Sequence, residues 1–190
     1  MNYIPIDIGQ RLNKQEILNN FKPNLDKIFN FWSFEKLTES NGGKYGVNDF
    51  TMVAKEKYTQ LCNYISLLPF TKLSNVKINI QREVAPPHID FMAPNEGKEL
   101  YQNNLKNEPS GYRIVVRGKN DVLKLHYENK EKICYMPADT DCYVTNHTSG
   151  WHSVGEDKDR ITIYISGFID KDKHITLLNK SKQKYSEYIV

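Results

Sequence analysis

The sequence predicts an α+β fold, in which N-terminal helices cover one sheet of an antiparallel β-sandwich or barrel. Two observations carry this prediction. Up to Pro69 the apolar residues recur at helical spacing, and after it they alternate with polar residues with a period of two. Short strand-like runs then follow at regular spacing, with turn residues between them. Helices first and strands afterwards is typical of helices packed on one side of a sheet.

Composition narrows the class of protein. The 190 residues are enough for one domain with a sizeable core, and apolar residues at 39% argue against disorder. A net charge of +3 without a basic, aromatic-lined stripe argues against a nucleic-acid partner. We expect no membrane partner, because no apolar run is long enough to span a bilayer and the first residues do not resemble a secretory signal. Three cysteines at no metal-binding spacing favour a reducing, cytoplasmic location.

We expect a single domain over residues 1–190, built in three parts. Residues 1–69 are mainly helical support, residues 73–168 are the β core, and residues 169–190 are a polar tail with a short helix and a loose end. The residues with the chemistry described below all belong to the second part.

Three helices are expected before the β core. The first follows Asn13, an N-cap residue with an acid three positions later. The second begins at Pro23 and extends to Trp32. The third runs from about residue 53 to 68, where Pro69 stops it.

The β core begins at residues 76–80, where aliphatic and polar residues alternate. Six further runs are predicted as strands: YRIVVRG (112–118), DVLKLHYE (121–128), KICYMP (132–137), DCYVTN (141–146), GWHSVG (150–155) and RITIYISGF (160–168). We expect the last two runs to form a hairpin centred on Asp157, which would place His152 opposite Thr162.

The last strand has two distinct faces. Its aliphatic face carries Ile161, Ile163 and Ile165 and can pack under the helices. Its other face begins with Arg160 and Thr162 and is expected to look into the barrel, where an arginine is costly unless an anion meets it. Only five of the 26 basic residues are Arg, so each is a candidate for the fork-shaped recognition of a carboxylate that lysine cannot provide.

Three residues of the core form a candidate metal site. His88 and Asp90 are two positions apart, so on an extended segment they point to the same face. The predicted hairpin adds His152. Two histidines and one carboxylate on one face of an octahedral ion form the facial triad of non-haem Fe(II) sites, with open positions for a bidentate 2-oxo acid and O₂. Arg160 and Thr162 would then bind the distal carboxylate of that acid.

Other interpretations of the histidines stay open. An isolated His-x-Asp is common, and by itself it indicates a solvated strand end. His147 competes with His152 as third ligand, but it lies in a turn and thirteen rather than eight residues before Arg160. We expect His126 to be a core or surface histidine within a strand, and His174 to be solvated in the polar tail.

The motifs HID (88–90), WHSV (151–154) and RIT (160–162) resemble those of the Fe(II)- and 2-oxoglutarate-dependent oxygenases, which have a double-stranded β-helix or jelly-roll core. They occur in the right order and at ordinary spacing, within a run of about half the chain (76–168). HSV followed by arginine eight residues later is most similar to the aspartyl/asparaginyl β-hydroxylase and proline hydroxylase branch.

The resemblance implies a hydroxylase that uses Fe(II), 2-oxoglutarate as co-substrate and O₂. It would bind iron through His88, Asp90 and His152 and hydroxylate a C–H bond of an amino acid, a peptide or protein side chain, or another small molecule, releasing succinate and CO₂. Two features depart from the family pattern: Thr162 replaces the serine of many members, and residues 91–111 look like an insertion. In such enzymes this region often covers the substrate, so the substrate is not defined.

Two further residues are assigned on the same basis. Arg113 lies on the strand after the metal strand, where related hydroxylases place an arginine, and would bind a carboxylate of 2-oxoglutarate or of the substrate. An exposed strand edge is the alternative for Arg113. Trp151 immediately precedes His152, so we expect it to point to the opposite face and to pack in the core.

Two rival functions fit the same pattern. A cupin-like metal-binding or sugar-modifying jelly roll would hold a metal without redox chemistry and would not need Arg160 buried beside it. A ligand-binding jelly roll would have lost the metal altogether. The sequence does not indicate the oligomeric state.

Overall fold

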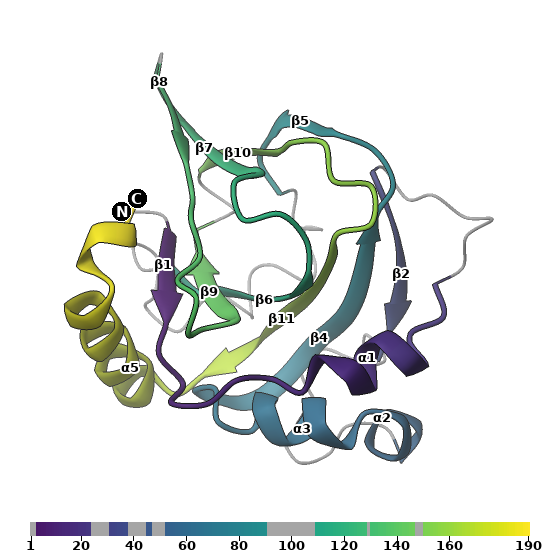
Figure 1. Ribbon diagram of the computed structural model, residues 1–190. Helices are drawn as coiled ribbons and strands as arrows, with labels where there is room; N and C mark the ends of the chain where they lie inside the picture. The colour runs from purple at the N-terminus through teal and green to yellow at the C-terminus, as the bar shows by residue number, and fades with distance from the viewer. Residues whose placement is uncertain are drawn as a thin grey trace.

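The structure is a computed structural model that describes residues 3–23, 31–37, 45–46, 52–90, 109–128, 130–146 and 150–190. In these residues two antiparallel sheets face each other, and the helices pack against the larger sheet (Figure 1). None of the described helices is long and apolar enough to cross a membrane.

The larger sheet has seven strands among the described residues. They are β1 (Tyr3–Ile6), β2 (Trp32–Lys36), β3 (Tyr45–Gly46), β4 (Phe70–Gln81), β6 (Gly111–Arg117), β9 (Cys142–Thr145) and β11 (Ile161–Ile169). Their order across the sheet is β1-β9-β6-β11-β4-β2, and β3 pairs with β4.

The smaller sheet contains β5 (Ala85–His88), β7 (Leu123–Tyr127), β8 (Lys130–Ile133) and β10 (Trp151–Val154), in the order β5-β10-β7-β8. The later strands return between the earlier ones: β11 lies between β4 and β6, and β10 lies between β5 and β7. This interleaving of two sheets is the jelly-roll, or double-stranded β-helix, arrangement. The predicted α+β fold with a jelly-roll core is therefore confirmed.

The predicted hairpin between the last two strands is wrong. His152 on β10 pairs with His88 and Leu125, whereas Thr162 on β11 pairs with Asn79 and Val115. Residues 155–160 cross from one sheet to the other instead of reversing the chain within a sheet. A short loop rich in Gly, Asp and Lys suits both connections, so its composition does not distinguish a hairpin from a crossover.

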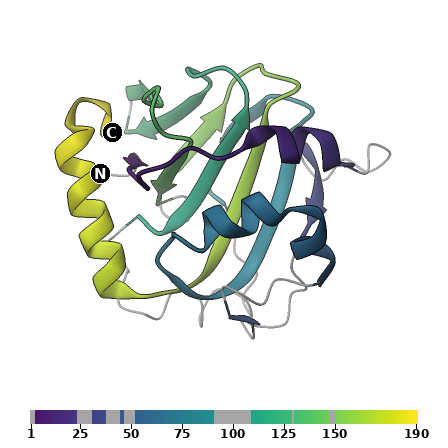
Figure 2. The same cartoon turned by 60° about the horizontal axis from the view of Figure 1, so that its bottom comes forward.

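The two faces of β11 are as predicted. Ile161, Ile163 and Ile165 are buried in the cluster that also contains Ile17 of the first helix and Leu61 of the third. Each buried aliphatic side chain contributes about 1.5–3 kcal/mol to folding. Figure 2 shows the helices lying across this outer face of the larger sheet.

The N-terminal third is less helical than expected. Helix α1 (Lys14–Asn20) begins after Asn13, whose side chain accepts a hydrogen bond from the Gln15 amide, as the N-cap prediction requires. The single helix expected at 53–68 is divided into α2 (Met52–Lys57) and α3 (Thr59–Ile65). Between them Tyr58 leaves the helical conformation, and its buried side chain donates a hydrogen bond to Glu35.

The helix expected from Pro23 lies largely outside the described residues, at 24–30. Its predicted end at Trp32 is wrong, because Trp32 begins β2 and pairs with Gln81 of β4. Strands β1 and β2 also add to the larger sheet, so residues 1–69 are not only helical support. Edge strands contributed from outside the 73–168 core were not evident in the sequence.

The C-terminal segment is a long helix with a fixed end, not a short helix with a loose one. Helix α5 (Lys171–Lys184) is followed by a single helical turn, η1 (Ser186–Tyr188). Leu178 of α5 is buried in the main core, and Ser181 accepts a hydrogen bond from the Asp7 amide. Val190 exchanges two backbone hydrogen bonds with Tyr3 of β1, so the two ends of the chain pair (Figure 1).

Candidate metal centre

His88, Asp90 and His152 come together at one end of the space between the sheets. His88 and His152 are direct partners in the β5–β10 ladder, so their side chains extend from adjacent positions. Asp90 follows β5 two residues later. Potential ligand atoms of the three residues all lie within 4.8 Å of one another. The three residues meet even though the predicted hairpin with β11 is wrong, because the pairing of β10 with β5 brings His152 beside His88.

Both histidines are oriented by backbone carbonyls. Nδ1 of His88 lies 2.7 Å from the Pro86 oxygen, and Nδ1 of His152 lies 3.1 Å from the Gly150 oxygen. A carbonyl can only accept, so Nδ1 carries the proton in each ring. The other nitrogen, Nε2, then offers its lone pair toward Asp90, which is the orientation that a metal-binding histidine needs.

Asp90 presents one oxygen to both histidines. Its Oδ1 lies 3.5 Å from Nε2 of His88 and 3.5 Å from Nε2 of His152. Nε2 of His88 is buried and has no hydrogen-bond partner among the described residues. The contact with the Asp90 carboxylate raises the pKa of His88, although partial burial opposes the rise. Two nitrogen lone pairs and one carboxylate oxygen that are directed at the same position form the donor set of a facial triad.

Arg113 lies beside the triad, on β6. Its Nη2 is 3.3 Å from Oδ2 of Asp90, and its Nη1 donates to the Tyr112 carbonyl at 3.0 Å. Its guanidinium carbon lies 3.8 Å from the centre of the Tyr164 ring. The exposed-edge alternative for Arg113 is therefore wrong, because the residue is only 6% exposed.

Arg160, immediately before β11, and Thr162 on β11 are both buried. Nε of Arg160 is buried and has no hydrogen-bond partner among the described residues. A buried guanidinium in this state is costly unless a ligand pairs with it. The expectation that Arg160 lies inside the jelly roll is correct, although it arrives there by a crossover.

A cavity of about 200 Å³ is lined by Arg160 and opens to solvent between the sheets. Tyr3, Val115 and Tyr143 line it, while exposed side chains such as Lys119 and Asn120 reach its edge. None of the three metal-site residues lines it. The cavity therefore extends from Arg160 in a direction other than the triad.

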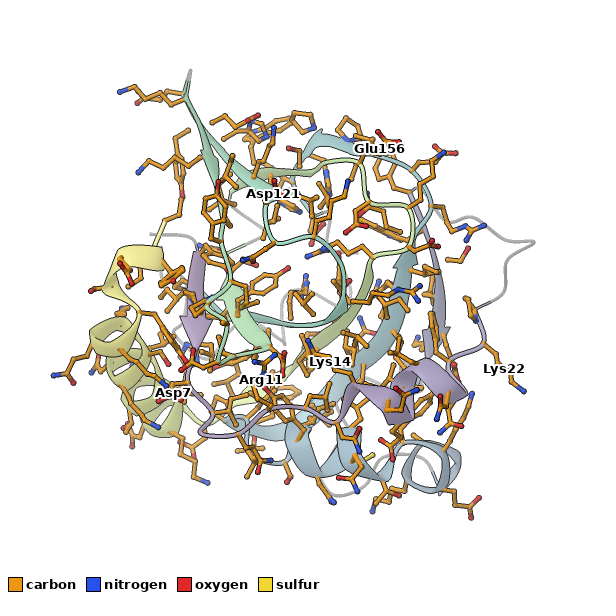
Figure 3. The ribbon with its side chains drawn as sticks, viewed as in Figure 1. Asp7, Arg11, Lys14, Lys22, Asp121 and Glu156 are labelled. Carbon is orange, nitrogen blue, oxygen red and sulfur yellow. The ribbon has the colours of Figure 1, made fainter. Side chains whose placement is uncertain are left out.

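Two more cations, neither of which was assigned a role from the sequence, line this cavity. Arg11 and Lys14 both pair with Oδ1 of Asp141, at 2.5 and 2.7 Å. Figure 3 labels these two cations, which lie near each other on the N-terminal segment. Burial would raise the pKa of Asp141, but hydrogen bonds from Arg11 and Lys14 hold it below its ordinary value. Four cationic side chains and one carboxylate are thus found among the lining residues. The scarcity of arginine made every arginine a candidate, but Arg11 was assigned no role, and only the fold shows where it lies.

Two of the remaining predictions are wrong. Trp151 is 53% exposed, because the described helices pack on the larger sheet and leave the outer face of β10 open. His174 is fully buried on α5, and its Nδ1 lies 2.7 Å from the Tyr112 hydroxyl. His126 is a part-buried strand residue bonded to Ser153, as expected for a structural histidine. His147 and most of the 91–111 segment lie outside the described residues.

Aromatic rings that the sequence did not assign to the site surround the triad. Trp32 of β2 lies 6.2 Å from the His88 ring and 6.0 Å from the Tyr164 ring, measured between centroids. Phe31 lies 6.0 Å from the His88 ring. Tyr164 was recognisable from its place on the polar face of β11, but Trp32 was not, because it was expected in a helix.

No protein-family model matches this sequence, and no curated protein matches it. Among solved structures, an oxidoreductase of the 2OG-Fe(II) oxygenase family from Burkholderia pseudomallei matches 80% of this chain and 75% of its own, with a TM-score of 0.42 and 7% identity. A prolyl hydroxylase from Trichoplax adhaerens, in complex with a hypoxia inducible factor oxygen degradation domain peptide fragment, matches 85% of this chain and 78% of its own, with a TM-score of 0.42 and 13% identity. These likenesses are too loose to support a function.

Proposed function

We propose that this protein is an Fe(II)- and 2-oxoglutarate-dependent dioxygenase that hydroxylates a C–H bond, with release of succinate and CO₂. The observation that carries the proposal is the convergence of Nε2 of His88, Nε2 of His152 and Oδ1 of Asp90 in a jelly roll that also holds a buried Arg160, whose Nε has no hydrogen-bond partner among the described residues. Three convergent donor atoms or a buried arginine would each be common alone, but this class of enzyme needs both the metal ligands and the arginine.

The residues present fit the metal. His88 and His152 offer unprotonated Nε2 atoms fixed by backbone carbonyls, and Asp90 offers a carboxylate oxygen beside them. This donor set suits non-haem iron and leaves coordination positions open. When bound, iron supplies the activation of O₂ that no side chain can provide.

The residues present also fit the co-substrate. We assign Arg160 and Thr162 to the distal carboxylate of 2-oxoglutarate, because both side chains are buried and the Nε of the Arg160 guanidinium has no hydrogen-bond partner among the described residues, so an anion would stabilise it. The chain's part in the reaction is to hold this acid in one orientation and to exclude water from the iron. Arg113 stays a second candidate for a carboxylate.

The substrate class is the finer part of the proposal. The HSV motif at residues 152–154, with Arg160 eight positions after His152, favours the aspartyl/asparaginyl β-hydroxylase and proline hydroxylase branch. We therefore propose a free amino acid or an amino-acid side chain of a peptide as substrate. Succinate formation that depends on added amino acids or peptides would identify it.

The direct test is anaerobic addition of Fe(II) and 2-oxoglutarate to the purified protein. We expect a visible charge-transfer band that is lost in His88→Ala and kept in the matched control His126→Ala, whose histidine lies on a neighbouring strand outside the triad. Arg160→Met should still bind metal but should need far more 2-oxoglutarate to give the band. Absence of the band in the wild type, or its survival in His88→Ala, would overturn the proposal.

The non-redox, cupin-like alternative makes a different prediction for one residue. Such a protein has no use for a buried arginine at this position, so the Nε of Arg160, which lacks a hydrogen-bond partner within the described part of the chain, favours the oxygenase. Full activity in Arg160→Ala would favour the alternative.

A further inference from the structure

The two oxygens of Asp90 have different neighbours. Oδ1 faces Nε2 of both histidines at 3.5 Å, whereas Oδ2 faces Nη2 of Arg113 at 3.3 Å. One oxygen of the Asp90 carboxylate is therefore directed at the proposed metal position, and the other is directed at the guanidinium of Arg113.

Arg113 is itself held from two other sides. Its Nη1 donates to the Tyr112 carbonyl at 3.0 Å, and its guanidinium carbon Cζ lies over the Tyr164 ring, 3.8 Å from the ring centre. Arg113 and Tyr164 are direct partners in the β6–β11 ladder, so two neighbouring strands fix the stacked pair. Planar stacking and fork-shaped donation together are properties of arginine that lysine does not share.

We propose that Arg113 is a positioning residue that holds Oδ2 of Asp90, so that this carboxylate offers a metal ion only Oδ1. A carboxylate can bind a metal through one oxygen or through both, and the second mode would occupy one more coordination position. With Oδ2 held by Arg113, that position stays available to an exogenous ligand. The inference rests on the proposed metal site, and it does not require 2-oxoglutarate or a particular substrate.

This role differs from the binding of a ligand carboxylate by Arg113, and the two roles affect different equilibria. A residue that orients Asp90 changes metal affinity and coordination when no 2-oxoglutarate is present. A residue that binds the co-substrate changes only the affinity for 2-oxoglutarate. The protein can therefore be tested with metal alone.

The test compares Arg113→Met, Arg113→Lys and the control Arg117→Met. Arg117 lies four residues along the same strand, is exposed, and donates to the Asp159 carbonyl away from the triad. Co(II) affinity is measured by competition titration, and the exchangeable waters on bound Mn(II) are counted by electron spin-echo spectroscopy in D₂O. We expect Arg113→Met to bind Co(II) about 10- to 100-fold more weakly and to hold one water fewer.

Arg113→Lys keeps the charge but loses the fork and the stacking, so we expect an intermediate loss of affinity, and Arg117→Met should match the wild type. Should Arg113→Met fail to fold, Arg113→Lys decides the question. Unchanged Co(II) affinity and water count in a folded Arg113 variant would overturn the positioning role, and a loss of 2-oxoglutarate affinity alone would indicate the carboxylate-binding role. If the wild type bound no metal, the proposed function itself would fail.

Discussion

Gly118 shows how one residue without a side chain supports the proposed co-substrate site. It has φ +147°, and an added Cβ would lie 2.6 Å from Cγ of Arg160 and 2.8 Å from Oδ2 of Asp157. The side chain of Arg160 therefore lies directly on the backbone of Gly118. Only glycine allows both this close approach and this backbone conformation.

We predict that Gly118→Ala displaces Arg160 and weakens 2-oxoglutarate binding on the order of tenfold, since overpacking costs about 1–3 kcal/mol. Calorimetry with Co(II)-loaded protein measures the effect, and Co(II) affinity should not change. Gly155→Ala is the control, because its added Cβ would meet neighbouring atoms only at 3.7 Å or more. Equal 2-oxoglutarate affinities in wild type and Gly118→Ala would contradict the prediction.

His174 is a buried histidine whose protonation opposes folding. Burial is the main cause that lowers its pKa from the ordinary 6.5 to about 4. Between these values the unfolded chain binds a proton that the folded protein does not, so stability increases with pH across this window. The neutral ring and its contact with the Tyr112 hydroxyl join α5 to β6.

We predict that acidification from about pH 7 to pH 4 removes up to about 3 kcal/mol of unfolding free energy through His174. Urea unfolding at several pH values measures it. The variant His174→Gln does not titrate, so its stability should fall less steeply over the same range. Parallel pH profiles for the two proteins would show that His174 is not responsible.

At the scale of elements, α3 receives its N-terminal cap from another helix. Tyr58, at the N-cap position of α3, makes no side-chain capping hydrogen bond. The carboxylate of Glu16 on α1 instead accepts hydrogen bonds from the amides of Gln60 and Leu61, at 2.9 and 3.0 Å. The sequence assigned Glu16 to the cap of its own helix, whereas the tertiary packing uses it for α3.

We predict that Glu16→Gln destabilises the protein by about 1 kcal/mol, because a charged acceptor at the start of α3 is replaced by a neutral amide that can donate as well as accept. Chemical denaturation measures the loss. Glu56→Gln, on the exposed surface of α2, is the control and should have little effect. A loss of the same size in both variants would argue against a specific cap.

At the scale of the whole molecule, positively charged side chains are concentrated around the cavity beside Arg160, the residue that we expect to bind a carboxylate. The chain carries a net charge of only +3, yet the cavity beside Arg160 is lined by four cationic side chains and one carboxylate. Arg11 and Lys14 come from the N-terminal segment, Lys119 from the end of β6, and Arg160 from the crossover. Convergence of distant segments concentrates positive potential that composition does not reveal.

We predict that 2-oxoglutarate binding weakens several-fold between roughly 0.02 and 0.5 M salt, because the exposed part of this potential is screened over about 10 Å at 0.1 M. Titrations at several ionic strengths measure the slope. Lys119→Gln should bind more weakly at low salt and show a shallower slope, whereas Lys171→Gln, on exposed α5, should behave as the wild type. A slope unaffected by Lys119→Gln would contradict a role of the cavity in binding.

The sequence alone determined what depends on local periodicity. The alternation in 160–168 predicted which side of β11 carries aliphatic residues, and the spacing of His88 and Asp90 predicted a shared direction. Both are properties of consecutive residues in an extended chain, so they hold whichever strands pair. The helical cover of one sheet also followed from the early change of period.

Only the tertiary structure decided what depends on strand pairing and layer contacts. His152 reaches the triad through β5 and not through a hairpin with β11, and Trp151 is exposed because no described helix covers its sheet. Arg113 is placed on Asp90 in the same way, by long-range pairing of β6 with β11. Such contacts join residues far apart in the chain, and one local pattern is compatible with several strand pairings. The sequence could therefore identify the residues of the site, but it could not identify the residues that they contact.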